Sequence, residues 1–173
     1  ENSYLAPQTL PMIPGAEAVG IRSDGKRVVS LLTGGYAEVV AAPDFMSYEV
    51  PDTVSDGAAL ALVLQGTTAW HLLKTSAHLA KGESVLVSAA AGGVGTASIQ
   101  VAHALGATTI AITLGPVKGE VARAAGAHHV LDAGDDCRAA AKALTGGKGA
   151  ELGGEPGGGA RDDRAGRGLA GPK

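Results

Sequence analysis

Val85-Leu-Val-Ser-Ala-Ala-Ala-Gly-Gly-Val-Gly95 is the stretch of sequence that decides the fold. Its apolar run at 85–87 predicts a buried strand, because β-branched and aliphatic residues favour extended structure. Small residues and glycines follow, and from 94 to 105 the apolar positions recur at the spacing of a helix with one buried face. The stretch therefore predicts a strand, a glycine turn and a helix, the first half of a βαβ unit.

The glycines of this turn match a dinucleotide-binding pattern, Ala90-x-Gly92-x-x-Gly95, with alanine where the first glycine usually stands. A pyrophosphate has to approach the backbone N–H groups at the positive end of the helix dipole. A Cβ at Gly92 would obstruct that approach, and a large side chain at Gly95 would hold the helix away from the strand. We expect the pyrophosphate to be bound by Ala91, Gly92, Gly93, Val94 and Gly95; the alternative is a tight turn without a ligand.

The composition fits a protein with its own core. The chain has 173 residues, enough for one domain or pieces of two, and 45% of them are hydrophobic but only 3% aromatic. A net charge of −3 with scattered Lys and Arg predicts neither a nucleic-acid nor a membrane surface. Without a signal peptide, a long apolar run or a second cysteine beside Cys137, we expect a cytoplasmic protein without an internal disulfide.

The tail differs in composition from the rest of the chain. After Gly146 the residues shift to Gly, Arg, Asp and Pro, and from 151 to 173 the only large apolar residues are Leu152 and Leu169. Such a segment buries too little surface to offset its ordering entropy. We therefore expect a poorly packed tail, with no stable strand through 151–155.

Upstream of the central stretch, residues 1–50 predict short β segments and turns. Pro7, Pro11 and Pro14 prevent long helices there. Two strands are expected, at 27–32 and 36–42. Two helices follow, at 56–64 with Ser55 as its N-cap, and at 67–76.

Downstream of the central stretch, strands and helices alternate. Strands are expected at 108–113 and 129–131, and helices at 116–126 and 137–144. The order β-α-β-α-β-α predicts an α/β fold with a parallel, doubly wound sheet.

The second strand of this unit predicts which cofactor binds. An NAD enzyme usually places Asp or Glu about 20 residues after the glycine turn, to accept from the ribose hydroxyls. No carboxylate stands there, and the nearest is Glu120. Gly115 leaves room for a 2′-phosphate, and Lys118 offers a cation. We therefore expect NADPH, the alternative being that Lys118 is only a solvated lysine.

A metal site is not expected. A catalytic zinc needs three protein ligands and a structural zinc needs four. Cys137 is the only cysteine and we expect it to be inert, since nothing basic is placed to lower its pKa. The histidines are at no ligand-like spacing; they are His71, His78, His103, His128 and His129.

Five motifs, taken together, resemble one family. They are Leu10-Pro-Met-Ile-Pro-Gly-Ala-Glu17-Ala-Val-Gly20, Gly34-Gly-Tyr-Ala-Glu38, Gln65-Gly-Thr-Thr68-Ala-Trp, Ala89-Ala-Ala-Gly-Gly-Val-Gly95 with Gln100, and Gly126-Ala-His-His-Val-Leu-Asp132. In this order and spacing the chain resembles the zinc-free quinone oxidoreductase branch of the medium-chain dehydrogenase/reductase superfamily, over about residues 10–150.

The resemblance implies an architecture and an activity. It implies a partial GroES-like β-barrel substrate domain at 1–50, the first part of a Rossmann domain with its leading helices at 51–150, and the Gly-rich tail at 151–173. It further implies reduction of a quinone or an α,β-unsaturated carbonyl by NADPH, in a homodimer or homotetramer. Thr68 matches a threonine near the nicotinamide, although helix capping or packing explains it equally well. Glu17 is expected to anchor the GroES-like core.

Departures from the family leave alternatives open. The beginning of the GroES-like domain and the second half of the Rossmann sheet are missing, and Ala133 stands where relatives often carry tyrosine. We therefore expect a fragment, or sequence error in the tail. No catalytic acid or base is assigned, which fits hydride transfer by a cofactor. The alternatives are an enoyl reductase of fatty-acid or polyketide type, and a non-catalytic nucleotide-binding protein.

Overall fold

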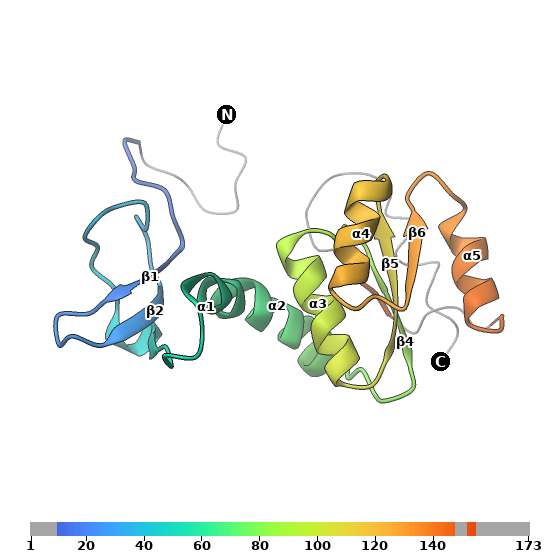
Figure 1. Ribbon diagram of the computed structural model, residues 1–173, viewed down its shortest axis with the longest axis horizontal. Helices are drawn as coiled ribbons and strands as arrows, with labels where there is room; N and C mark the ends of the chain where they lie inside the picture. The colour runs from blue at the N-terminus through green and yellow to red at the C-terminus, as the bar shows by residue number, and fades with distance from the viewer. Residues whose placement is uncertain (1–9, 148–151, 155–173) are drawn as a thin grey trace. The chain divides into compact units, whose positions relative to one another are not determined.

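The computed structural model describes residues 10–147 and 152–154 of the chain (Figure 1). The chain divides into two compact units, Glu1–Leu64 and Gln65–Lys173. Each unit is described below by itself.

The first unit is built on a three-stranded antiparallel sheet in the order β1-β2-β3. Its strands are β1 (Glu17–Ile21), β2 (Arg27–Leu31) and β3 (Ser47–Glu49), and a short 3₁₀ turn, Asp44–Met46, leads into β3. The strand predicted at 27–32 is thus confirmed as the centre of this sheet.

The prediction of a strand at 36–42 is wrong: these residues form bends and irregular backbone in the structure. Two backbone bonds hold the start of the segment, from Gly35 N to Gly15 O at 3.2 Å and from Tyr36 N to Pro14 O at 3.0 Å. Beyond them the segment is open: the exposed fraction is 79% for Tyr36 and 89% for Val39. An alternating apolar pattern specifies a strand only where one face is buried, and here neither side chain is.

Helix α1 (Asp56–Ala61) covers the sheet of the first unit and completes its core. The predicted N-cap is confirmed, since Ser55 Oγ accepts from Ala58 N at 3.2 Å. The buried core residues are Val29, Val50, Ala59 and Val63.

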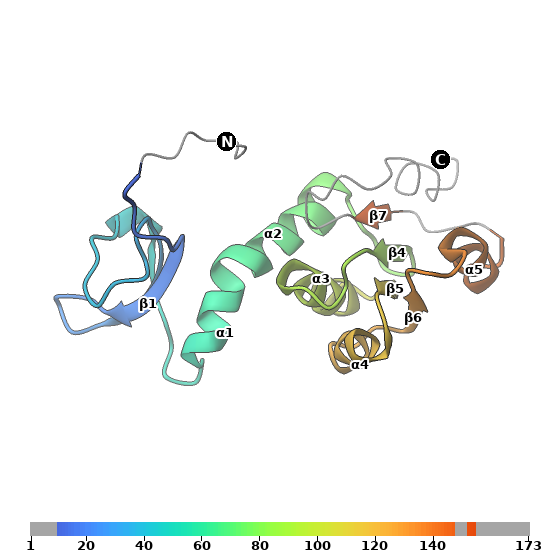
Figure 2. The same ribbon diagram turned by 90° about the horizontal axis from the view of Figure 1, so that it is seen from above.

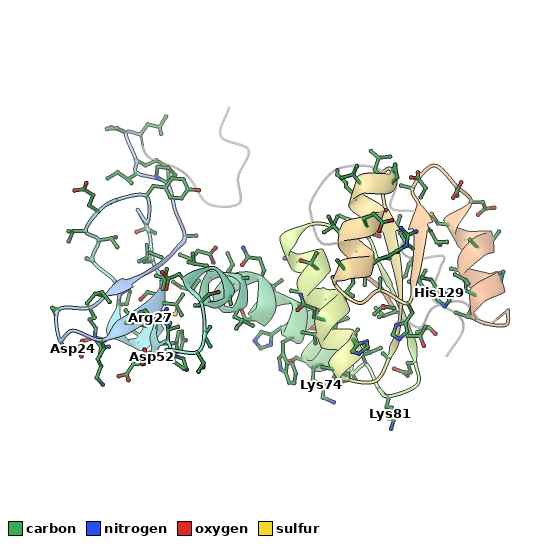
Figure 3. The ribbon with its side chains drawn as sticks, in the orientation of Figure 1. Asp24, Arg27, Asp52, Lys74, Lys81 and His129 are labelled. Carbon is green, nitrogen blue, oxygen red and sulfur yellow. The ribbon has the colours of Figure 1, made fainter. Side chains whose placement is uncertain are left out.

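Arg27 joins β2 to the segment that leads into α1 (Figure 3). Its Nη1 donates to Asp56 Oδ1 at 2.8 Å, and its Nη2 donates to the carbonyl oxygens of Pro51 and Val54, each at 2.7 Å. The planar guanidinium thus makes three bonds to one short loop, which a single ammonium group cannot reproduce.

The helices predicted at 56–64 and 67–76 are confirmed, but no break separates them. Two π-helical turns, Leu62–Gly66 and His71–Ser76, flank α2 (Thr67–Trp70). Gly66 has helical dihedral angles, with φ −66° and ψ −45°, so it does not end the helix. No helix among the described residues is long and apolar enough to cross a membrane.

The second unit is built on a parallel sheet in the order β6-β5-β4-β7. Its strands are β4 (Ser84–Val87), β5 (Thr108–Thr113), β6 (His129–Asp132) and β7 (Leu152–Gly154). Its helices after β4 are α3 (Gly93–Ala104), α4 (Pro116–Ala124) and α5 (Cys137–Leu144). The predicted alternation of strands and helices is therefore confirmed.

Helices cover both faces of this sheet, with α3 and α4 on one face and α5 on the other (Figures 1 and 2). Side chains alternate along β4 accordingly: Val85 and Val87 belong to the cluster that α3 and α4 complete, and Leu86 belongs to the opposite cluster with Ile110 and Ala141. The sheet is thus doubly wound, as the sequence predicts.

The expectation that no strand forms through 151–155 is wrong for 152–154. β7 pairs in parallel with β4, in the register Val85↔Leu152, Leu86↔Gly153 and Val87↔Gly154. Strand pairing uses backbone groups, which glycine retains, so the missing side chains weaken a strand without abolishing the ladder. The rest of the predicted poorly packed tail, 155–173, lies outside the described residues.

Candidate dinucleotide-binding site

The glycine turn begins where β4 ends. Ala89 has a left-handed φ of +48°, which is unusual for a residue other than glycine. Ala90 N donates to Ile112 O of β5 at 3.1 Å, and Gly92 N donates to Ala89 O at 2.8 Å. Backbone bonds therefore fix this turn against the neighbouring strand and against itself.

Gly95 lets α3 lie directly on the turn. A Cβ at this position would lie 2.5 Å from Ala89 O and 2.7 Å from Ala90 Cα, and both of these are backbone atoms that cannot rotate away. The predicted role of Gly95, close contact between helix and strand, is confirmed. A Cβ at Gly92 would meet only Ala89 O, at 3.2 Å.

The first turn of α3 presents backbone donors. Gly92 is the N-cap and supplies no side-chain cap, and both Gly92 and Gly93 are exposed. Thr96 Oγ1 donates to Gly92 O at 3.0 Å, so this side chain caps a carbonyl and leaves the first N–H groups of the helix in place. A glycine turn at the positive end of a helix of ordinary length fits a pyrophosphate.

Helix α2 packs against α3 beside this turn. Gln65, in the π-helical turn just before α2, also reaches α3, because its Cγ lies 3.1 Å from the position of a Cβ on Gly93. Thr68 is half-buried and stands three positions after Gln65, on the same face of the helix. The structure thus brings Thr68 to the helix pair beside the glycine turn, and its role toward a nicotinamide stays a prediction.

A second turn, between β5 and α4, lies at the carboxyl edge of the same sheet. Gly115 is the N-cap of α4 and has φ +80°, a conformation that glycine adopts without strain. Lys118 is exposed in the first turn of α4, and no carboxylate among the described residues forms an ion pair with it. Both residues therefore stand where the sequence analysis places the 2′-phosphate.

Sequence reasoning missed Asp132, the last residue of β6. Gly115 N donates to Asp132 Oδ2 at 2.8 Å, and Gly134 N donates to Asp132 Oδ1 at 3.0 Å. These bonds from Gly134 and Gly115 lower the pKa of the Asp132 carboxyl below its ordinary value. Glu120 is the nearest carboxylate in the sequence, but Asp132 reaches the turn in space, from the adjacent strand. Asp132 directly follows a predicted parallel strand, and this position in the sequence could have indicated that it lies at the carboxyl edge of the sheet.

His103, His128 and His129 lie away from the glycine turn (Figure 3). His128 Nδ1 accepts from Thr109 N at 3.1 Å, and the rings of His103 and His128 stack with centroids 5.6 Å apart. Figure 3 shows Lys81 and His129 at the amino-terminal edge of the sheet, opposite the edge where the glycine turn follows β4. No group of three or more His, Cys, Asp or Glu within 10–147 and 152–154 is arranged to hold a metal ion.

Cys137 does not contribute a nucleophile. Its Sγ donates to Asp132 O at 3.4 Å, and burial together with the nearby Asp135 raises the pKa of the thiol above its ordinary value. No basic side chain is among the causes of this shift, as expected, and a thiol of raised pKa is a poor nucleophile at neutral pH.

Known proteins share this sequence and fold. Residues 93–160 match the family model described as zinc-binding dehydrogenase. The quinone oxidoreductase of Pongo abelii is 33% identical over 144 residues, which cover 76% of this chain and 44% of that protein. The polyketide synthase GfsB of Streptomyces halstedii is 41% identical over 102 residues, which cover 59% of this chain and 2% of that protein. The quinone oxidoreductase from Thermus thermophilus, also solved in complex with NADPH, has 36% identity and a TM-score of 0.80, covering 90% of this chain and 51% of that chain.

The fold and the glycine turn define an α/β protein with a Rossmann sheet, preceded by antiparallel strands of a GroES-like domain. The chain carries a zinc-binding dehydrogenase domain and has structural neighbours in the medium-chain dehydrogenase/reductase superfamily, in agreement with the resemblance of its motifs. Within that superfamily it is a homologue of the quinone oxidoreductases, and it spans about half the length of these relatives.

Proposed function

We propose that this chain binds NADPH and forms part of a reductase that acts on quinones or α,β-unsaturated carbonyls. The observation that carries the proposal is the contact between Gly95 and the Ala89–Ala90 backbone, which seats the start of α3 on the turn, where no N-cap side chain accepts from its first N–H groups. The Thermus thermophilus relative solved with NADPH supports the choice of cofactor.

The chain's own residues divide the binding between two turns. The backbone of 91–95 holds the pyrophosphate, Gly115 leaves space for the adenosine 2′-phosphate, and Lys118 supplies the cation that pairs with it. We expect Thr68 to contact the nicotinamide end of the cofactor. When bound, NADPH supplies a hydride from its nicotinamide ring to an electron-poor acceptor, and the protein orients the two.

A substitution at the helix N-cap tests the pyrophosphate site. Gly92 has φ −80° and ψ 172°, which any residue adopts, and aspartate is a good N-cap. We expect Gly92→Asp to preserve the fold but to abolish NADPH binding, because its carboxylate accepts from the same N–H groups and repels phosphate. Gly92→Ser is the matched control: it caps the helix and adds the same Cβ without a charge, so the difference in affinity between the two variants measures the effect of the charge. Fluorescence titration of NADPH measures both; equal affinity for wild type and Gly92→Asp would overturn the proposal.

A second substitution tests the 2′-phosphate site. We expect Lys118→Ala to weaken NADPH binding by about 1.5–3 kcal/mol, the scale of a hydrogen bond to a charged group, and to leave NADH binding almost unchanged. Titration of both cofactors against both proteins decides the point. Equal losses of affinity for the two cofactors would contradict the proposed role of Lys118 in binding the 2′-phosphate.

The main alternative is an enoyl reductase, and it is favoured by the likeness to polyketide synthase GfsB. Turnover of NADPH with a quinone supports the first proposal, and turnover with an enoyl thioester supports the alternative. Binding without either turnover supports a non-catalytic nucleotide-binding protein. We also propose a cytoplasmic, zinc-free homodimer or homotetramer, which elemental analysis and light scattering test.

A further inference from the structure

The carboxylate of Asp132 joins two loops at the carboxyl edge of the parallel sheet. One oxygen accepts from Gly115 N at 2.8 Å, in the turn before α4, and the other accepts from Gly134 N at 3.0 Å, in the turn before α5. Asp132 pairs in register with Thr113, so its position is fixed by β5 as well. Both oxygens are thus engaged by backbone donors, and the side chain is held against the Gly115 turn.

The same turn carries the cation assigned to the cofactor. Lys118 stands three positions after Gly115, exposed in the first turn of α4. The other charged side chains of α4, Glu120 and Arg123, pair with each other at 2.6 Å. The Gly115 turn thus has a lysine three positions after it and an aspartate bonded to its backbone, and the two side chains have opposite charge.

We infer that Asp132 determines how strongly the site prefers NADPH over NADH, because its fixed carboxylate repels the 2′-phosphate that Lys118 attracts. This inference rests on the proposed function, since it concerns the same cofactor site. NADH has no phosphate at that position, so the charge of Asp132 acts on one cofactor alone. The bonds to Gly115 and Gly134, in contrast, shape the turn for both cofactors.

Asp132→Asn separates these two effects. Asparagine keeps the size of the side chain and one acceptor oxygen, but it loses the charge and turns an NH₂ group toward one of the two backbone donors. The lost bond loosens the turn and lowers the affinity for both cofactors alike. This loss therefore cancels in the ratio of the two affinities. We expect the ratio of NADPH to NADH affinity to rise about five-fold at low salt, the scale of a charge acting across one turn near a protein surface.

The dependence on ionic strength tests whether the charge of Asp132 causes the change in the affinity ratio. The Debye length falls from about 10 Å at 0.1 M salt to about 3 Å at 1 M, so a through-space charge effect has to shrink in concentrated salt. We expect the difference in ratio between Asp132→Asn and wild type to fall below about two-fold at 1 M NaCl. Glu120→Gln is the control, because it removes one negative charge from α4 without touching Gly115; its ratio should stay within about two-fold of wild type.

The experiment is a fluorescence titration of NADPH and NADH against each protein at both salt concentrations, with circular dichroism as a check of folding. An unchanged or lower ratio for Asp132→Asn, or a higher ratio that survives 1 M salt, would overturn the inference and leave the proposed function standing. Binding of neither cofactor to wild type would overturn both. If Asp132→Asn does not fold, Asp132→Ser, whose hydroxyl accepts from Gly134 N in the same short turn, carries the same expectation.

Discussion

The carbonyl oxygen of Ala89 lies 2.5 Å from the position that a Cβ on Gly95 would occupy. Real Cβ atoms do not approach a backbone oxygen this closely, so only glycine permits α3 to start where it does. Ala89 itself has a left-handed φ of +48°, and its carbonyl oxygen also accepts from Gly92 N at 2.8 Å. The contact between these two residues therefore sets the position of the helix N-terminus that faces a cofactor.

Gly95→Ala tests this contact, with Gly119→Ala as the matched control. Both glycines are buried in helices on the same face of the sheet, but a Cβ on Gly119 would lie 3.5 Å from Val130 Cγ1, an ordinary contact. We expect Gly95→Ala to lower the free energy of unfolding by about 1–3 kcal/mol or more, through overpacking. Gly119→Ala should raise it by about 0.5–1 kcal/mol, since alanine favours a helix. Urea unfolding followed by Trp70 fluorescence measures both; equal effects would contradict the contact.

Much of the second unit could be predicted because its signals are local. The strand at 108–113 and the helix at 137–144 have the expected bounds, since β-branched residues and a Gly after the last turn of a helix act on their own neighbourhood. Gly95 could be assigned for the same reason: the turn, the strand and the helix that it joins are consecutive in sequence.

The failures have one physical cause, which is pairing between distant segments. Residues 36–42 alternate as a strand does, but no neighbour buries one of their faces. β7 was rejected because of its glycines, and it forms because β4 offers a backbone edge. Asp132 was overlooked at the Gly115 turn because the two are brought together by adjacent strands rather than by sequence. Such pairings follow from topology, which the sequence indicates only in outline.

The contact between Gln65 and Gly93 gives a prediction about coupling. Gln65 Cγ lies 3.1 Å from the position of a Cβ on Gly93, tighter than an ordinary contact, so Gly93→Ala alone forces Gln65 to move. In a Gln65→Ala background the space is open, and we expect the added methyl to stabilise α3 by about 0.5–1 kcal/mol. A double-mutant cycle of unfolding free energies measures the coupling, expected at about 0.5 kcal/mol or more. Additive effects would show that the two residues do not meet.

Arg27→Lys tests the three bonds that join β2 to the loop before α1. A lysine reaches at most part of this set, so we expect a loss of about 1–2 kcal/mol of stability in the first unit. The control is Lys26→Met, which removes an exposed ion pair with Glu49 and should cost less than about 1 kcal/mol. Amide hydrogen exchange in β2 reports on this unit separately, and unchanged exchange in Arg27→Lys would contradict the expected loss.

Lowering the pH should remove the stability that the protein gains from the two hydrogen bonds that the Asp132 carboxylate accepts. In the folded protein the N–H groups of Gly134 and Gly115 lower the pKa of Asp132 below 3.8, its ordinary value. A carboxyl whose pKa is lower in the folded than in the unfolded state stabilises the fold fully above its unfolded pKa, and this contribution is lost as the pH falls through the folded pKa.

Asparagine at this position does not titrate, so the wild-type protein should be more stable than Asp132→Asn at pH 7 and should lose this advantage progressively below about pH 4. Asp24, whose pKa the Arg22 side chain lowers to about 2, titrates in both proteins and cancels from the comparison. Urea unfolding of the two proteins at pH 7, 4 and 3 measures the difference. A gap that stays constant across this range would mean that the folded and unfolded pKa values of Asp132 are equal, and that the bonds to Gly115 and Gly134 do not stabilise its charge.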